Sequence, residues 1–216
     1  MSVSYVNSIS QDLAQAGSHT ITMPSGIQAG DLILIVLHLS ISGVTSVSSG
    51  YTDLGTINVS GTTYTRKYYK IADGSETEFV IDHSTTPDGV AGIIVLRGDF
   101  STPPIIQQEY LTSTGTSSIT TTALHGINVN NAVVFFALSQ DAGVVTASTP
   151  SGYTEVFDNG YDDGTGRSMA CSYKLYPNAT ENPSCTASAT CDYVWGLLFD
   201  VGVVGSNEGI FLGFSF

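Results

Sequence analysis

The sequence predicts an all-β protein, a β-sandwich of two antiparallel sheets built from an internal duplication. Helical periodicity is nearly absent along the chain. Short apolar or alternating runs are separated by Gly, Ser, Asn, Asp and Pro, which is the pattern of strands joined by tight turns. The third observation is that the second half of the chain repeats the first half in order.

The repeat is clearest at Ser49–Asp53, which returns as Ser151–Glu155 at an offset of 102 residues. Other matches follow in the same order at offsets of 100 to 104, and they are 26–36 with 126–136, 69–71 with 173–175, and 92–95 with 196–199. This period is much longer than that of a solenoid repeat, so we interpret it as a single duplication. The repeated residues belong to strands and turns, and none of them is a catalytic group.

Candidate strands of the first copy lie at 18–23, 31–39, 62–71, 78–82 and 90–97. The run from Leu32 to Leu37 is apolar at every position, so we expect both faces of that strand to be buried. Asp12–Ala16 is the one stretch compatible with a helical turn, which Gly17 would end. The turn at Asp73-Gly74 suits a hairpin that requires a positive φ.

Candidate strands of the second copy lie at 116–122, 131–139, 167–176, 184–188 and 193–203, followed by a last strand at 208–216. The last strand alternates and places four apolar side chains on one face. We predict an interface there, formed by Ile210, Phe211, Leu212, Phe214 and Phe216. This apolar stripe either closes the sandwich of its own subunit or packs against a neighbour.

The chain is predicted to form a single domain over residues 1–216, with quasi-repeats at about 18–98 and 116–203. Each copy offers about four strands, and a sheet of that size must cover its apolar face. We therefore expect the two copies to interleave in one sandwich. The stretch 97–104 joins them, and it is too short for a flexible linker.

Composition excludes several classes of function. The net charge is −13 with only six Lys and Arg residues, so no basic face for nucleic acid can form. The longest apolar run has the length of a strand, far below the ~20 residues of a membrane-spanning helix. The N-terminus lacks the basic and apolar segments of a signal peptide, so we expect synthesis in the cytoplasm.

No motif for catalysis or for a cofactor stands out. The histidines, which are His19, His38, His83 and His125, have no metal-ligand spacing. We expect His125 on the surface and His38 as a hydrogen-bonded residue at the rim of a buried strand. G-x-S-x-G and phosphate-loop patterns are missing from the sequence. The sequence therefore predicts no enzyme activity, no catalytic residues, no cofactor and no metal site.

An acidic turn and three cysteines leave alternatives open. Asp158, Asp162 and Asp163 lie in a Gly- and Asn-rich turn whose oxygen ligands suit calcium. The terminal Glu of an EF-hand loop is absent, and the same residue types are ordinary in hairpins. Cys185 and Cys191 could meet across a hairpin, which would leave Cys171 alone, but free buried thiols are the favoured interpretation.

Three motifs indicate a resemblance. Pro24–Leu37 reads Pro-x-Gly-x-x-x-Gly-Asp before an apolar strand, Tyr69–Glu76 reads Tyr-Lys-Ile-Ala-Asp-Gly-Ser-Glu, and Val95–Pro103 reads Val-Leu-Arg-Gly-Asp-Phe-Ser-Thr-Pro. The chain resembles, from about residue 18 to 203, a jelly-roll module of tailed-bacteriophage structural proteins. That family includes capsid cement (decoration) proteins and some tail-fibre tips, and the resemblance implies binding without catalysis.

The same motifs have physical roles in the fold. Asp31 follows a tight turn and is expected to cap local amides. Arg97 places a fixed charge at a strand end, where Asp99 or Asp73 is expected to hold it.

Three functional classes compete. The first is a capsid cement protein, a virion component that binds the major capsid protein on the outer shell surface, and the resemblance implies a homotrimer. The second is a receptor- or carbohydrate-binding tip of a phage tail fibre, and the third is a free-standing lectin or hydrolase. The sequence has no repetitive fibrous stalk, which favours the cement role.

Overall fold

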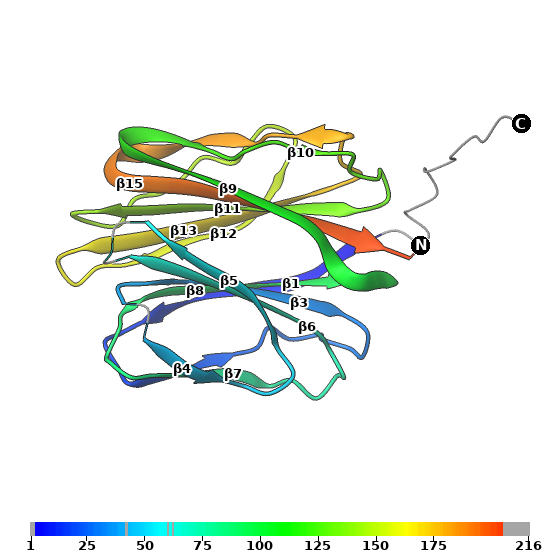
Figure 1. Ribbon diagram of the computed structural model, residues 1–216, viewed down its shortest axis with the longest axis horizontal. Coiled ribbons are helices and arrows are strands. Elements are labelled where there is room, and N and C mark those ends of the chain that lie inside the picture. Colours follow the sequence, from blue (N-terminus) through cyan, green and yellow to red (C-terminus); the bar gives the residue numbers. More distant parts are fainter. Residues whose placement is uncertain (1–2, 42, 60, 62, 205–216) are drawn as a thin grey trace, which may run out of the picture.

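Two large antiparallel sheets lie face to face at the centre of the molecule, and each carries a smaller sheet on its outer side (Figure 1). This computed structural model describes residues 3–204 except 42, 60 and 62, and none of these described residues is helical. The predicted all-β, antiparallel sandwich is therefore confirmed. Its layers are more numerous than expected, because each half of the chain contributes two of the sheets.

The first half forms a five-stranded sheet in the order β1-β8-β3-β6-β5 and a three-stranded sheet in the order β2-β7-β4. Its strands are β1 (Ser4–Leu13), β2 (Ser18–Thr22), β3 (Leu32–Leu39), β4 (Val44–Val47), β5 (Thr52–Asn58), β6 (Tyr64–Ile71), β7 (Glu78–His83) and β8 (Gly89–Arg97). The chain alternates between the two sheets at most of its turns. Gly74 has a φ of 89°, which is the conformation expected of the Asp73-Gly74 turn.

The second half forms a five-stranded sheet in the order β12-β13-β11-β15-β9 and a two-stranded sheet of β10 and β14. Its strands are β9 (Phe100–Thr120), β10 (Leu124–His125), β11 (Ala132–Asp141), β12 (Thr154–Tyr161), β13 (Gly166–Leu175), β14 (Thr180–Glu181) and β15 (Ser184–Val203). Strands β9 and β15 are long enough to run through both layers of this half.

The two halves share one topology, so the sequence repeat corresponds to a structural repeat. In strand order, β12, β13, β11, β15 and β9 correspond to β5, β6, β3, β8 and β1. The far end of β9 pairs with the start of β15, where Ile119 lies opposite Cys185, and this repeats the pairing of β2 with β7. An isolated bridge between Ala147 and Ala187 repeats the pairing of β4 with β7.

The expectation that the two copies interleave is wrong. Every strand of each large sheet comes from one half of the chain, and the halves pack face to face. Several pairings within a half, such as β5 with β6 and β12 with β13, join adjacent segments, which costs less loop-closure entropy than pairing between halves. Residues 97–104 were predicted as a link, yet β9 begins at Phe100. Asp12 lies in β1, where a helical turn was considered.

Apolar residues of the central strands pack alternately into different layers. Leu34 and Val36 of β3 join Phe136 of β11 in a core between the two large sheets. Their neighbours Ile33 and Ile35 face the other way, into a core between the large and small sheets of the first half. A third core fills the second half in the same manner. The prediction that both faces of 32–37 are buried is confirmed, since all six side chains are inaccessible.

The central core brings the halves into close contact. A Cβ atom added to Gly92 of β8 would lie 2.5 Å from Cζ of Phe157 and 2.6 Å from Sδ of Met169, both in the second half. The predicted last strand, 208–216, and its interface residues Ile210, Phe211, Leu212, Phe214 and Phe216 lie outside the described residues.

We expect residues 1–98, expressed alone, to be insoluble or loosely packed, because the inner face of their large sheet would lose its cover. Near-ultraviolet circular dichroism and binding of a hydrophobic dye would measure this, with the full chain as the control. A soluble monomeric half that unfolds cooperatively would show that the central core is not required for folding.

Candidate functional site

The three carboxylates of the acidic turn point to different partners. Asp158 accepts a hydrogen bond from the Ala147 N–H at 2.8 Å, and Asp162 accepts one from the Gly164 N–H at 2.8 Å. Asp163 lies 3.9 Å from the Arg167 guanidinium. Within residues 3–204, apart from the three omitted positions, no cluster of three His, Cys, Asp or Glu side chains could hold a metal ion. The arrangement is that of a hairpin whose polar side chains satisfy local groups.

All three cysteines are free and buried, as predicted. Cys185 and Cys191 lie on the same strand, β15, opposite Ile119 and Thr116 of β9, so they do not face each other across a hairpin. Burial raises the pKa of Cys185 to about 12 and also raises the pKa of Cys171 and Cys191. The thiolate, which is the reactive form, is therefore disfavoured at all three positions.

Two histidines form a buried pair that the sequence did not reveal. His19 and His83 come from the paired strands β2 and β7, and their Nδ1 and Nε2 atoms are 3.1 Å apart. The Nε2 of His19 donates to the Ala14 carbonyl, so its Nδ1 accepts from His83. Burial lowers the pKa of His83 to about 4. His125 is exposed, as predicted.

His38 was predicted to lie at the rim of its strand. It is instead completely buried where the two halves meet. Its Nε2 donates to the Ser139 carbonyl at 3.0 Å, and its ring packs edge-on against Trp195 with the centroids 4.7 Å apart. Trp195 in turn donates its indole N–H to Thr65 at 3.0 Å. Burial lowers the pKa of His38 to about 3, with a smaller contribution from the Arg167 charge.

Further polar contacts link the halves around His38. Arg167 of β13 forms an ion pair with Asp88 at 2.9 Å, and both side chains are buried. Burial raises the pKa of Asp88, which the nearby guanidinium opposes. Gln140 accepts a hydrogen bond from Thr63 of the first half. A rim of buried polar contacts thus accompanies the central apolar core, although His38 Nδ1 and Arg167 Nε have no hydrogen-bond partner among the described residues.

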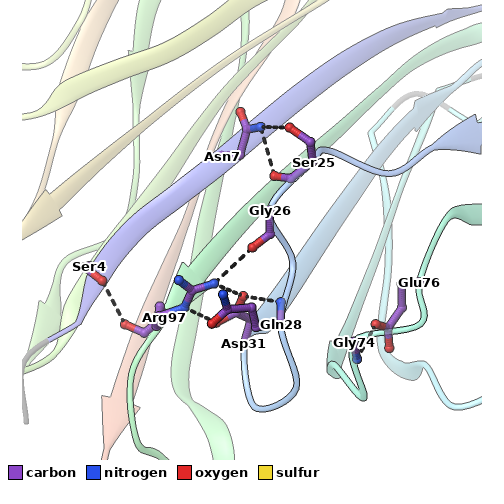
Figure 2. Close-up of polar contacts among 9 residues, drawn as sticks. All are labelled: Ser4, Asn7, Ser25, Gly26, Gln28, Asp31, Gly74, Glu76 and Arg97. Carbon is purple, nitrogen blue, oxygen red and sulfur yellow. Dashed lines mark hydrogen bonds and ion pairs between the residues drawn. The ribbon is translucent and has the colours of Figure 1, made fainter.

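A second ion pair holds the start of β3 to the end of β8 (Figure 2). Two guanidinium nitrogens of Arg97 lie 2.8 Å from the two carboxylate oxygens of Asp31, and Arg97 also donates to the Gly26 carbonyl at 3.0 Å. Asp31 accepts from the Gln28 N–H, so its predicted capping role is confirmed. The predicted partners of Arg97 were wrong. The buried Asp31 is adjacent across the sheet, whereas Asp73 pairs with Lys70.

In the second half a hydrogen bond between an amide and a carboxyl takes the place of this ion pair. Asn131, which corresponds to Asp31, donates from Nδ2 to Asp200 at 2.7 Å. No cation pairs with that carboxyl among the described residues, and burial raises the pKa of Asp200 to about 6. The Oδ1 atom of Asn131 is buried without a hydrogen-bond partner among the described residues.

A cluster of Lys, Glu and Tyr occurs in both halves. Lys70 lies 2.7 Å from Glu76 and above the ring of Tyr51 at 5.8 Å. Lys174 repeats this, at 2.7 Å from Glu181 and 5.7 Å from the centre of the Tyr153 ring. In both halves the glutamate also accepts hydrogen bonds from turn amides. The cluster orders the turn after β6 in the first half and the turn after β13 in the second. We therefore assign it a structural role.

Two surface features remain as candidates for binding. The first is strand β9 at the edge of the second large sheet, which carries the exposed apolar residues Ile106, Tyr110 and Leu111. The second is a cavity of about 220 Å³ beside β4 in the first half. Neither was predicted, because exposure and cavity shape depend on how distant strands pack.

No protein-family model, curated protein or solved structure matches this chain. No helix in the described part of the chain is long and apolar enough to cross a membrane.

We expect acid to destabilise the protein through His38. Its folded pKa of about 3 lies below the ~6.5 of an unfolded histidine, so the unfolded state binds the extra proton as the pH falls. The free energy of unfolding should lose about 2–3 kcal/mol through this residue between pH 7 and 4.5.

Urea denaturation of wild type, His38→Gln and the exposed control His125→Gln at both pH values would measure the effect. Between pH 7 and 4.5, His38→Gln should lose less free energy of unfolding than wild type, whereas His125→Gln should lose as much as wild type. If His38→Gln does not fold, the wild-type ring can be followed by NMR, and titration near pH 6.5 would contradict the prediction.

Asp200 should destabilise the folded protein as the pH rises, whereas His38 destabilises it as the pH falls. Its folded pKa, about 6, is above the ~3.9 of an unfolded aspartate, so its contribution is most favourable below pH 4 and is lost as the pH rises towards 6. Asp200→Asn should therefore stabilise the protein by about 1–2 kcal/mol at pH 7, and by less at pH 4. Denaturation at the two pH values checks this, and an Asp200→Asn variant that is less stable at pH 7 would refute it.

Proposed function

We propose that this chain is a capsid cement protein of a tailed bacteriophage, bound to the outer surface of the shell and stabilising it without catalysis. The partner is the major capsid protein, and the chain acts as a homotrimer. The motifs at Pro24–Leu37, Tyr69–Glu76 and Val95–Pro103 support the family, and the acidic charge suits a protein that does not contact nucleic acid.

The order of strands in the first half supports a jelly roll. Strands β1, β3, β5, β6 and β8 lie in the large sheet, whereas β2, β4 and β7 lie in the small one. Successive strands therefore cross between two antiparallel sheets at every connection except that from β5 to β6, much as they do in a double Greek key.

The observation that carries the proposed role is the edge of β9. Within the described residues this 21-residue strand is hydrogen-bonded as a strand only to β15. Side-chain hydrogen bonds from Thr122 to the Tyr110 carbonyl and from Gln107 to the His125 carbonyl are its contacts with the segment that follows. Ile106, Tyr110 and Leu111 of β9 are 39%, 48% and 44% exposed. Exposed apolar edges favour association with another chain, and a protein that bridges subunits of a shell requires such a surface.

The C-terminal stripe of Ile210, Phe211, Leu212, Phe214 and Phe216 is proposed as a second contact, either with a neighbouring copy or with the shell. Its support is the alternation of apolar residues in the sequence. A tail-fibre tip is the second candidate function, and the polar cavity beside β4 is the feature that favours it.

The proposal predicts that particles lacking this chain assemble but release their genome at a lower temperature or lower salt concentration. Adding back the purified protein should restore heat resistance. Leu111→Asn should occupy the shell at least about tenfold less than wild type, because a polar group in a packed interface costs on the order of 1–3 kcal/mol. Val144→Asn, which replaces a loop residue that is 47% exposed, is the matched control and should bind normally.

Thermal unfolding of the free variants separates binding from folding, since both substitutions are on the surface. Equal occupancy by Leu111→Asn and wild type would contradict a β9 interface. Particles that lack the protein, withstand heat normally and fail to adsorb to cells would replace the cement role with that of a fibre tip.

A further inference from the structure

We propose that a second cavity, beside the end of β6, is a docking site for the aromatic ring of Phe211 from the C-terminal segment of the same chain. This inference does not rest on the proposed capsid role. The cavity has a volume of about 320 Å³ and lies between the end of β6, the turn before β3 and the segment 98–104. Among its lining residues are Gly30, Tyr69, Ile71, Asp99, Phe100 and Pro104.

The walls of this cavity suit an apolar ring. Ile71 is 41% exposed, and Phe100 adds a further apolar side chain. The hydroxyl of Ser101, a polar group of the wall, already donates to the carbonyls of Pro103 and Gly202. A cavity of ~150 Å³ is large enough for a benzene molecule, so the space here accommodates a phenyl ring together with part of its backbone.

The second half of the chain shows what covers the equivalent tyrosine. Tyr173 of β13 corresponds to Tyr69 of β6, since each lies opposite a corresponding residue of β11 or β3. The ring of Tyr5 from β1 is stacked on Tyr173, with the centroids 5.1 Å apart and the planes 8° from parallel. Offset stacking is a favourable arrangement of two aromatic rings. In one half of the duplicated fold, an aromatic ring from another segment therefore covers this tyrosine.

The first half lacks that cover because β9 has a smaller side chain where β1 has Tyr5. Tyr5 lies opposite Leu96 of β8, and Ile105 lies opposite Val201 of β15. Leu96 and Val201 lie in turn opposite corresponding residues of β3 and β11, so Ile105 takes the position of Tyr5. The residue before Ile105 lines the cavity together with Tyr69. An isoleucine provides no ring to stack there, and the space is left for a ring from elsewhere.

The C-terminal segment starts at the rim of this cavity. The Val204 N–H donates to the carbonyl of Asp99 at 2.7 Å, and Asp99 lines the cavity. Phe211 follows seven residues later, and seven residues can span up to about 25 Å. A short tether gives the segment a high effective concentration at its own cavity. The same chain is therefore favoured over a second copy as the source of the ring.

The alternation predicted for 208–216 selects Phe211 among the apolar residues of the segment. The four other members of the stripe share one face, whereas Phe211 lies on the opposite face with Gly213 and Ser215. Phe211 is thus the one large apolar side chain on its face. Its insertion leaves the four-residue face available for the contact with a neighbouring copy or with the shell.

The test is NMR spectroscopy of the full chain with labelled isoleucine methyl groups and labelled phenylalanine rings. We expect nuclear Overhauser contacts between the Ile71 methyl groups and the Phe211 ring. Phe211→Ala should abolish these contacts and shift the Ile71 methyl signals, because the ring current of Phe211 is lost. Phe214→Ala, the matched control from the other face, should leave both the contacts and the signals unchanged.

A mixture of chains labelled only in isoleucine with chains labelled only in phenylalanine identifies the source of the ring. Contacts between Ile71 and Phe211 in this mixture would show that a second copy supplies the ring, and would overturn the proposal. Absence of the contacts in doubly labelled wild type would overturn it as well, and that measurement does not depend on the folding of any variant. Contacts that survive Phe211→Ala and disappear in Phe214→Ala would have the same consequence.

Discussion

The packing of one large sheet on the other is the interaction on which the rest of the structure depends. Each central strand, such as β3, has an outer face covered by its own half and an inner face that only the other half covers. Burial of apolar surface contributes about 25 cal/mol per Å², and this layer is the most extensive apolar contact between the halves. His38, Trp195 and the Arg167–Asp88 pair lie beside it. Because an unpaired buried polar group costs about 1–3 kcal/mol, these contacts favour one orientation of the halves.

Duplication followed by divergence explains which residues serve the fold. The Lys–Glu–Tyr cluster occurs in both halves with nearly equal distances, as expected of a device that every copy of the module needs. The Asp31–Arg97 pair does not recur, since the second half has the Asn131–Asp200 contact and a carboxyl with a raised pKa. The cavity beside β4 is likewise confined to the first half, and β9 has an exposed apolar edge.

Much of the fold could be predicted from the sequence because strand and turn signals are local. The run 32–37 and the repeated Ser-Gly-Tyr-Thr turn identified central strands and the duplication. The sequence could not show whether the halves interleave, because both arrangements bury the same residues. It also missed the burial of His38 and the partner of Arg97, since each depends on residues 66 to 101 positions away. The cavity beside β4 required the packing of two sheets, which no local pattern encodes.

Native-state hydrogen exchange would test most directly whether the two halves form one cooperative unit through the central layer. The slowest amides of β3 and β11 should exchange with the same free energy of opening and the same dependence on denaturant, because loss of either sheet exposes the inner face of the other. Two separate free energies, with β3 and β11 opening independently, would contradict the account.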